Sequence, residues 1–248
     1  MKPVARRGLG LLVILCCLAV WILTSGMGAR QRRGRTCQGK GTLAVTVLDS
    51  LDRAFIGRED IEQWLDKEYR AYAGLPLDSV DLTRIEEIIL GHSAVKECQA
   101  WLTDDGILHV ELRQRKPVLR LEDGAGGSYA DESGFLFPLQ ARGSVDVPVV
   151  EAKLPVGQEW LQQVVALVLS MEGTVWQQDI RRMKADSHGN LTLVPAQGRE
   201  RFVFGQPVRV EEKLALMQRY YDSVAPAHEA GYYGTVDVRY RGQLICRK

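Results

Sequence analysis

Alternating apolar and polar positions in residues 95–115 predict a β-hairpin. In residues 107–115 every second side chain is apolar, which is the period of a strand with one buried face. The preceding strand supplies a matching apolar set. The inward positions on the two strands are Leu108, Val110 and Leu112, and Cys98, Ala100 and Leu102.

The length of the hairpin loop follows from these faces, because a slip of one residue would place apolar side chains opposite polar ones along the ladder. A three-residue loop over 104–106 pairs Leu102 with Leu108 and puts Glu97 opposite Arg113, an opposite-charge pair on the wet face. We expect Gly106 to be left-handed. The other polar-face side chains, Trp101 among them, are either solvated or part of an interface.

The residues before the hairpin predict one strand and two helices. Residues 42–48 are β-branched and alternate, residues 58–73 carry apolar positions at helical spacing, and a second helix begins after Asp81 and ends at Gly91. The order β-α-α-β-β predicts a compact α+β module over residues 42–116, with both helices on one face of a small sheet.

After Pro117 the pattern changes to many short strands. We expect a β-rich domain over 117–248 with two packed helices, at 158–171 and 210–224. A hairpin over 128–138 turns near Gly134. The other expected strands are 118–122, 147–150, 180–185, 191–194, 201–204 and a terminal strand or hairpin over 233–248.

The N-terminal pattern predicts a membrane segment. An apolar run follows the basic residues of the short tail 1–8 and continues without a charge to Gly28, so residues 9–28 are long enough for a transmembrane helix. A cleaved signal peptide fits the same pattern. Residues 29–41 are rich in Arg and Gly and are expected to form a basic linker.

Composition excludes several function classes. The chain is 46% hydrophobic and 25% charged with a formal net charge of +1, which indicates a globular protein without general attraction to nucleic acid. Its five cysteines form no CxxC pair and have no histidine at metal spacing, so a zinc or redox motif is not indicated. A disulfide among Cys37, Cys98 and Cys246 is left open.

No catalytic, cofactor-binding or metal-binding residue is predicted. The four histidines lie in no nucleophile or metal motif, and the acidic pairs 104–105 and 131–132 stand where tight turns favour aspartate. We therefore expect neither an enzyme nor a small-molecule substrate.

The end of the chain is the best candidate for a binding surface. An open terminal strand suits recognition by strand addition, in which backbone groups bond to the partner and alternate side chains give choice. Val238, Tyr240, Leu244 and Ile245 would lie beside that edge. The alternative is that this strand only completes the sheet.

Three segments resemble the FtsQ/DivIB family of bacterial cell-division proteins. LHVELRQRKPVLRL is similar to the family's passage from a POTRA module into its β-domain. SYADESGFLFP is similar to its Tyr-x-Asp-x-x-Gly-x-x-Phe-Pro pattern, and GTVDVRYRGQLICRK to its closing Asp-x-Arg-Tyr segment. The order of tail, membrane helix, linker, POTRA-type module and β-domain is also the same.

The resemblance implies a non-catalytic divisome scaffold, single-pass in the bacterial inner membrane, with its C-terminal domains in the periplasm. The basic residues after the apolar run would, by flanking charge alone, favour the opposite orientation. It also implies FtsB/FtsL-like partners and other divisome components, bound through the POTRA module and by strand addition at the last strand. Tyr240 is then the first candidate contact and Arg239 the second, next to Val238. Gln243, Leu244, Ile245 and Cys246 are assigned by their position along the edge.

A second interpretation comes from another class of protein. A secreted or envelope-anchored POTRA-containing assembly or transport component would use the same module to bind client peptides. Cleavage after Ala29 would favour it.

Overall fold

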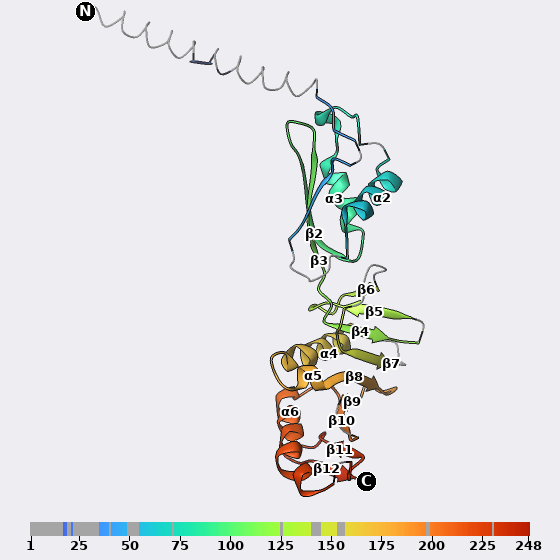
Figure 1. Cartoon of the computed structure of the whole chain (residues 1–248), viewed down its shortest axis with the longest axis vertical. Helices are drawn as coiled ribbons and strands as arrows, with labels where there is room; N and C mark the ends of the chain where they lie inside the picture. The colour runs from blue at the N-terminus through green and yellow to red at the C-terminus, as the bar shows by residue number, and fades with distance from the viewer. Residues whose placement is uncertain are drawn as a thin grey trace, which may run out of the picture. The chain divides into compact units, whose positions relative to one another are not determined.

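The computed structural model describes residues 17–18, 21, 35–39, 41–48, 55–70, 72–124, 126–139, 145–152, 157–196, 199–229 and 231–248. It divides into two compact units, residues 1–114 and 115–248 (Figure 1). Each unit has its own buried core and is described by itself.

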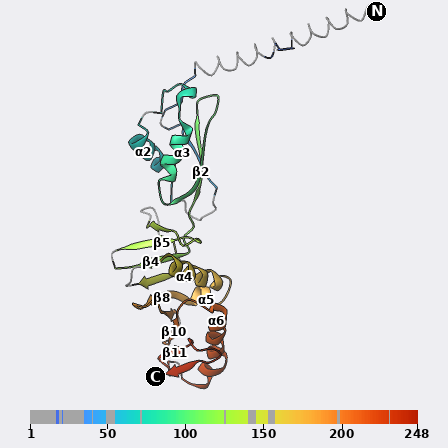
Figure 2. The same cartoon turned by 180° about the vertical axis from the view of Figure 1, so that it is seen from behind.

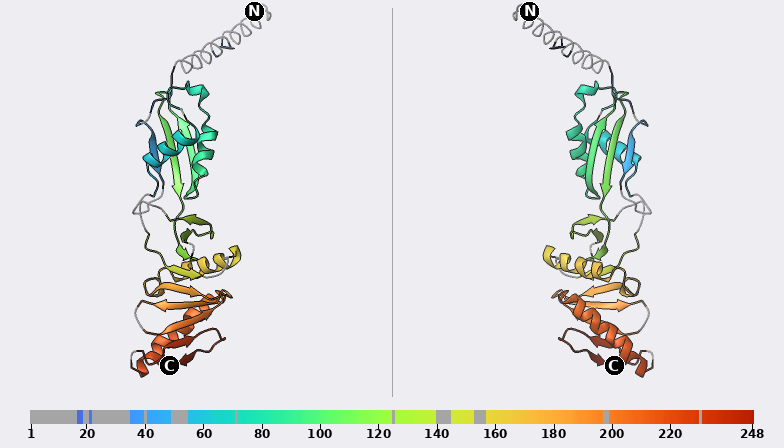
Figure 3. Two further views of the ribbon diagram at one scale, coloured as in Figure 1. Left: turned by 90° about the vertical axis from the view of Figure 1, so that its right-hand side faces the viewer. Right: turned by 90° about the vertical axis from the view of Figure 1, so that its left-hand side faces the viewer.

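Unit 1 is a three-stranded sheet with two helices. Its elements are β1 (Ala44–Val47), α2 (Arg58–Glu68), the 3₁₀ turn η1 (Leu77–Ser79), α3 (Leu82–Leu90), β2 (Val95–Leu102) and β3 (Leu108–Gln114). The strand order is β1-β3-β2, with β1 parallel and β2 antiparallel to β3 (Figure 3). The buried side chains of α2 and α3 include Ile61, Leu65, Ile85 and Ile89. The predicted β-α-α-β-β order is confirmed.

The hairpin has the register that the alternation predicts. Leu102 pairs with Leu108 and Glu97 with Arg113, whose side chains form an exposed ion pair at 3.6 Å. Gly106 is left-handed, with a φ of 87°. On the polar face Trp101 stacks on His109 with ring centroids 5.2 Å apart, and it keeps 40% of its surface exposed.

Gly106 is needed for two reasons, because its φ is positive and a Cβ there would overlap the carbonyl oxygen of Thr36. Gly106→Ala is expected to destabilise unit 1 by about 2–4 kcal/mol, through left-handed strain plus displacement of the backbone at Thr36. Gly74 is the matched control, since its φ is 82° and a Cβ there would meet nothing within 4 Å. Denaturant-dependent amide exchange in β3 measures both; equal losses for the two variants would contradict the steric argument.

Two predicted helices end earlier than their apolar spacing suggests. The first was expected to reach residue 73, but α2 ends at Glu68 and Arg70 takes a left-handed φ of 69°. In unit 2 the predicted helix 210–224 is α6 (Val210–Arg219) followed by a π-helical turn, η2 (Tyr220–Val224). In both places an apolar residue beyond the α-helix, Tyr72 or Tyr220, is still buried. The apolar spacing in the sequence therefore continues past the residue at which the α-helical backbone ends.

Unit 2 is one nine-stranded sheet. Its strands are β4 (Leu119–Glu122), β5 (Gly127–Ala130), β6 (Leu136–Pro138), β7 (Val149–Ala152), β8 (Ile180–Ala185), β9 (Leu191–Pro195), β10 (Arg201–Gly205), β11 (Thr235–Asp237) and β12 (Ile245–Arg247). Their order is β12-β11-β10-β9-β8-β7-β4-β5-β6. The chain thus builds the sheet outward in both directions, and β12 and β6 are its two edges.

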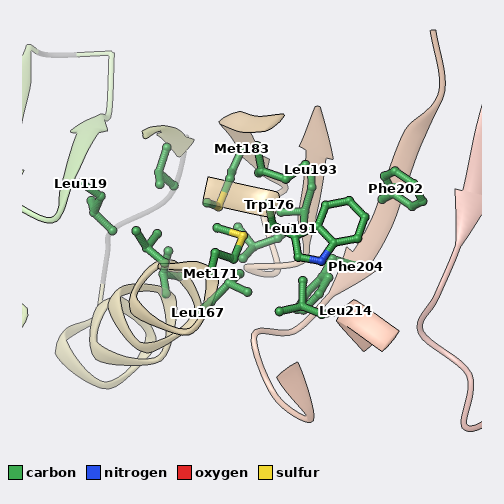
Figure 4. Close-up of a cluster of buried hydrophobic side chains, with 14 of the residues drawn as sticks. Leu119, Leu167, Met171, Trp176, Met183, Leu191, Leu193, Phe202, Phe204 and Leu214 are labelled. Carbon is green, nitrogen blue, oxygen red and sulfur yellow. The ribbon is translucent and has the colours of Figure 1, made fainter. Parts of the chain in front are cut away.

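Helices cover one side of this sheet. They are α4 (Gln158–Met171), a short α5 (Trp176–Asp179) that the sequence did not predict, and α6 (Figures 1 and 2). Leu167 and Met171 of α4 and Leu214 of α6 pack with Leu191, Leu193, Phe202 and Phe204 of the sheet (Figure 4). The structure therefore adds a third, four-residue helix to the two that were predicted, and its Trp176 packs against Phe202 of β10 and Tyr221 of η2.

The segment SYADESGFLFP forms the β5–β6 hairpin. Tyr129 and Phe137 are buried, and Gly134 has a φ of 77° at the turn. The Asp131 carboxylate accepts hydrogen bonds from the Ser133 side chain at 2.6 Å, the Phe135 N–H at 3.0 Å and Arg115 at 2.7 Å. Burial raises the pKa of Asp131, but these bonds outweigh burial and hold the pKa below its ordinary value. The Tyr-x-Asp-x-x-Gly-x-x-Phe-Pro pattern therefore stabilises the β5–β6 turn through Asp131.

Among the residues that the structure describes, no helix is long and apolar enough to cross a membrane. The predicted span 9–28 lies outside those residues except for Cys17, Leu18 and Trp21.

Candidate functional site at the C-terminal edge

The last two strands form the edge of the large sheet. β11 runs parallel to β10, and β12 pairs antiparallel with β11, so that Val236 faces Cys246. In the strand order β12 stands at the end, with β11 on one side and no described strand on the other (Figure 1). The predicted terminal hairpin is confirmed. Its outer side is an open edge within the part of the chain that the structure describes.

The direction of the backbone groups on β12 can be worked out from its neighbours. The Val238 N–H donates to Val203 and the Gly234 carbonyl accepts from Arg201, so the backbone groups on both sides of Thr235 and Asp237, at even-numbered positions, bond to β10. The N–H and C=O of successive residues point to opposite sides of a strand, so Thr235 and Asp237 face β12. Their register partners are Arg247 and Ile245.

Cys246 therefore presents its N–H and C=O to the open edge. A separate bond agrees, because the Gly234 N–H donates to the Arg247 carbonyl at 2.9 Å, which places that carbonyl on the inner side. The Cys246 side chain is half-buried and packs against the core. Its backbone is thus available for pairing while its side chain holds the strand in place.

The predicted site residues take different positions on this edge. Val238 is buried in the core, so it supports the hairpin and has no exposed side chain to offer. Tyr240 is 47% exposed and Ile245 37% exposed. Gln243 is exposed, and Leu244 is half-buried against the core. The structure therefore brings the predicted residues together on one hairpin, where Tyr240 and Ile245 offer the large exposed apolar surfaces.

Arg239 forms an ion pair within its own hairpin, although its side chain stays 44% exposed. Its guanidinium donates to both carboxylate oxygens of Asp237, at 2.9 and 2.7 Å, and its stem lies over Gly205. Asp237 is 3% exposed; burial raises its pKa, but the bonds from Arg239 outweigh burial and keep it below the ordinary value. In the Asp-x-Arg-Tyr segment, the Asp237–Arg239 ion pair therefore fixes the end of β11, and Tyr240 stays exposed to solvent.

The first turn of α6 holds the tip of the same hairpin. Arg209 donates to the Arg239 carbonyl at 2.6 Å and to Glu212 at 3.0 Å. Glu212 in turn accepts a hydrogen bond from the Gly242 N–H at 3.0 Å, and this bond, followed by Arg209, lowers the pKa of Glu212. We call Arg209 and Glu212 the α6 clamp. Sequence reasoning missed it, although the i, i+3 charge pair was readable.

Among the described residues, no three His, Cys, Asp or Glu side chains group as metal ligands. The His92 ring stacks on the Trp64 ring with their centroids 3.5 Å apart, and His188 lies in the turn after Asp186. Cys37, Cys98 and Cys246 are free thiols.

Two family models match the chain. Residues 116–247, more than half of its length, match the family described as FtsQ/DivIB, C-terminal related. Residues 36–113 match the POTRA-like domain. No curated protein matches the chain in sequence.

Proposed function

Since the chain belongs to the FtsQ/DivIB family, we propose that it is a membrane-anchored scaffold of the bacterial division machinery that binds a partner by strand addition along β12. The family consists of division scaffolds without enzymatic activity that make protein–protein interactions in the divisome. The partners proposed for this chain are FtsB/FtsL-like proteins.

The outward backbone of β12 is the observation that carries the proposal. An edge residue that presents both N–H and C=O is a template for an added strand, because the partner's backbone satisfies both groups. Tyr240 and Ile245, exposed on the same hairpin, would give the interaction its specificity for the partner's side chains. Aromatic residues of this kind often dominate the free energy of binding at interfaces.

The proposed anchor is the predicted transmembrane helix 9–28, with both structured units in the periplasm. FtsQ/DivIB proteins are in general membrane-anchored. The POTRA-like unit would contribute to recruitment, and its half-exposed Trp101 supports an interface on the polar face of its sheet.

Co-purification tests the proposed function. The full chain, and a form ending at Leu244 that lacks β12, are recovered from bacterial membranes, and co-purifying proteins are identified by mass spectrometry. Small single-pass division proteins should accompany the full chain and disappear with the shortened form. Amide exchange in the core strands β9 and β10 checks that both forms are folded.

The second interpretation predicts a different set of proteins in this experiment. Outer-membrane assembly or transport proteins, captured equally by both forms, would contradict the scaffold proposal.

The α6 clamp should position the edge for binding. Glu212→Ala removes the acceptor of the Gly242 N–H and the partner of Arg209, so the hairpin tip should loosen. We expect faster exchange of the Gly242 amide and about fivefold weaker partner binding, the usual scale for one lost hydrogen bond. Glu212→Gln keeps an acceptor oxygen and should restore most of both. Weaker binding with unchanged Gly242 exchange would exclude a positioning role.

A further inference from the structure

A cavity of about 600 Å³ lies in unit 2 beside the segment that leads into β11. Its walls come from the residues just before β10, from η2 and from the loop before β11. Tyr220, Tyr221, Tyr232 and Tyr233 supply four aromatic side chains, and Glu200 and Glu229 supply two carboxylates. We call it the tyrosine cavity.

Glu200 is the unusual residue of this wall. It is 6% exposed, and its carboxylate accepts a hydrogen bond from the neighbouring Arg199 N–H at 3.0 Å. No cation of the described chain forms an ion pair with it; the Arg199 side chain is exposed and packs beside Gly231. A buried carboxylate is costly unless a cation or several donors compensate it. The carboxylate thus lacks the partner that its burial calls for.

The neighbouring Tyr221 hydroxyl is also buried and, among the described residues, has no hydrogen-bond partner of proper geometry. Burial first, and then a side-chain interaction with the Glu200 carboxylate, raise the pKa of Tyr221, so the hydroxyl lies close to that carboxylate. A ligand N–H donor at this point of the cavity would reach the Glu200 carboxylate beside the tyrosine hydroxyl.

The aromatic walls favour a positively charged ligand. Ring faces attract ammonium and guanidinium groups, and one wall residue already does so: the Lys248 ammonium lies 4.2 Å from the centre of the Tyr232 ring. The ring centroids of Tyr220 and Tyr221 are 5.3 Å apart, and those of Tyr232 and Tyr233 are 4.9 Å apart. The four rings therefore form two packed pairs. The lining contains two carboxylates and one guanidinium, and the Lys248 ammonium lies beside it at Tyr232.

We propose that the tyrosine cavity binds the basic side chain, Lys or Arg, of a polypeptide partner, with Glu200 as its ion-pair acceptor and the tyrosine rings as its walls. A polypeptide is favoured because the family makes protein–protein interactions and because Tyr233 belongs to the segment entering β11. This site is separate from backbone pairing along β12 and does not depend on it.

Titration of the full chain in detergent micelles tests this proposal. The probes are Nα-acetyl-lysine methylamide and Nα-acetyl-arginine methylamide, with the neutral norleucine amide as the matched control. Ring resonances of labelled tyrosines report binding. We expect saturable shifts at Tyr220, Tyr221, Tyr232 and Tyr233 with the basic probes, and at least tenfold weaker binding of the norleucine amide.

Glu200→Gln is the matched variant, because it keeps the shape and the acceptor for the Arg199 N–H but removes the charge. It should weaken the basic probes at least tenfold. If this variant does not fold, the comparison of basic and neutral probes on the wild-type chain tests the proposal by itself. Three results would each overturn the proposal: no shift with either basic probe, equal binding of the norleucine amide, or unchanged binding by a folded Glu200→Gln chain.

Discussion

Replacing Cys246 by proline is expected to lower the affinity for the partner by a factor of about 100 or more, while the fold is kept. Proline removes the backbone N–H that Cys246 presents to the open edge, and its ring occupies the space of an incoming strand. The inner bonds of β12 belong to Ile245 and Arg247, so the pairing with β11 remains. The affinity of the co-purified partner for purified wild-type and variant chains measures the loss.

Cys246→Val separates the backbone from the thiol. Valine keeps the N–H and fits the half-buried position against the core, so its partner affinity should stay within a fewfold of the wild type. If valine and proline weaken binding equally, the side chain is the contact and strand addition is wrong at this position.

Tyr240→Ala is expected to weaken partner binding by about 30-fold or more, the scale of an aromatic hot spot. Tyr240 is 47% exposed and lies next to Arg239, whose guanidinium is 5.9 Å from its ring centre. Arg239 is held by Asp237, so loss of the tyrosine ring removes contact area without opening the core. The same affinity measurement applies.

Phe135→Ala is the matched control for Tyr240→Ala. Phe135 is similarly exposed, at 41%, but stands beside β6 at the opposite edge of the sheet. Its truncation should leave partner affinity unchanged. A larger loss from Phe135 than from Tyr240 would move the interface to the β6 edge.

Local patterns in the sequence predicted much of the fold. The β2–β3 register followed from alternation alone, because only one loop length keeps the two apolar faces together. The turn at Gly134 and the cap at Asp81, whose side chain accepts from the Arg84 N–H at 3.0 Å, followed from single residues. These features depend on neighbours close in the chain.

Long-range pairings were not predictable in the same way. The terminal hairpin was expected, but its parallel pairing with β10 joins residues more than 30 positions apart, and no local pattern specifies it. The α6 clamp joins Glu212 to Gly242 across a similar separation. The residues of the edge could therefore be named from the sequence, but not which of them face outward.

Buried polar residues were the hardest to predict. Glu200 looks like a surface residue in the sequence, since glutamate is rarely buried, and only the packed walls around it show otherwise. Arg239 pairs with buried Asp237 while its side chain stays 44% exposed, and the sequence, in which the two residues are two positions apart at a strand end, does not reveal this ion pair.

Amide hydrogen exchange along β12, with and without the bound partner, tests strand addition most directly. The Cys246 amide faces the open edge, whereas those of Ile245 and Arg247 face β11. We predict that the partner slows exchange at Cys246 strongly and at Ile245 and Arg247 little. Partner binding that leaves the Cys246 amide as fast as in the free chain would contradict the account.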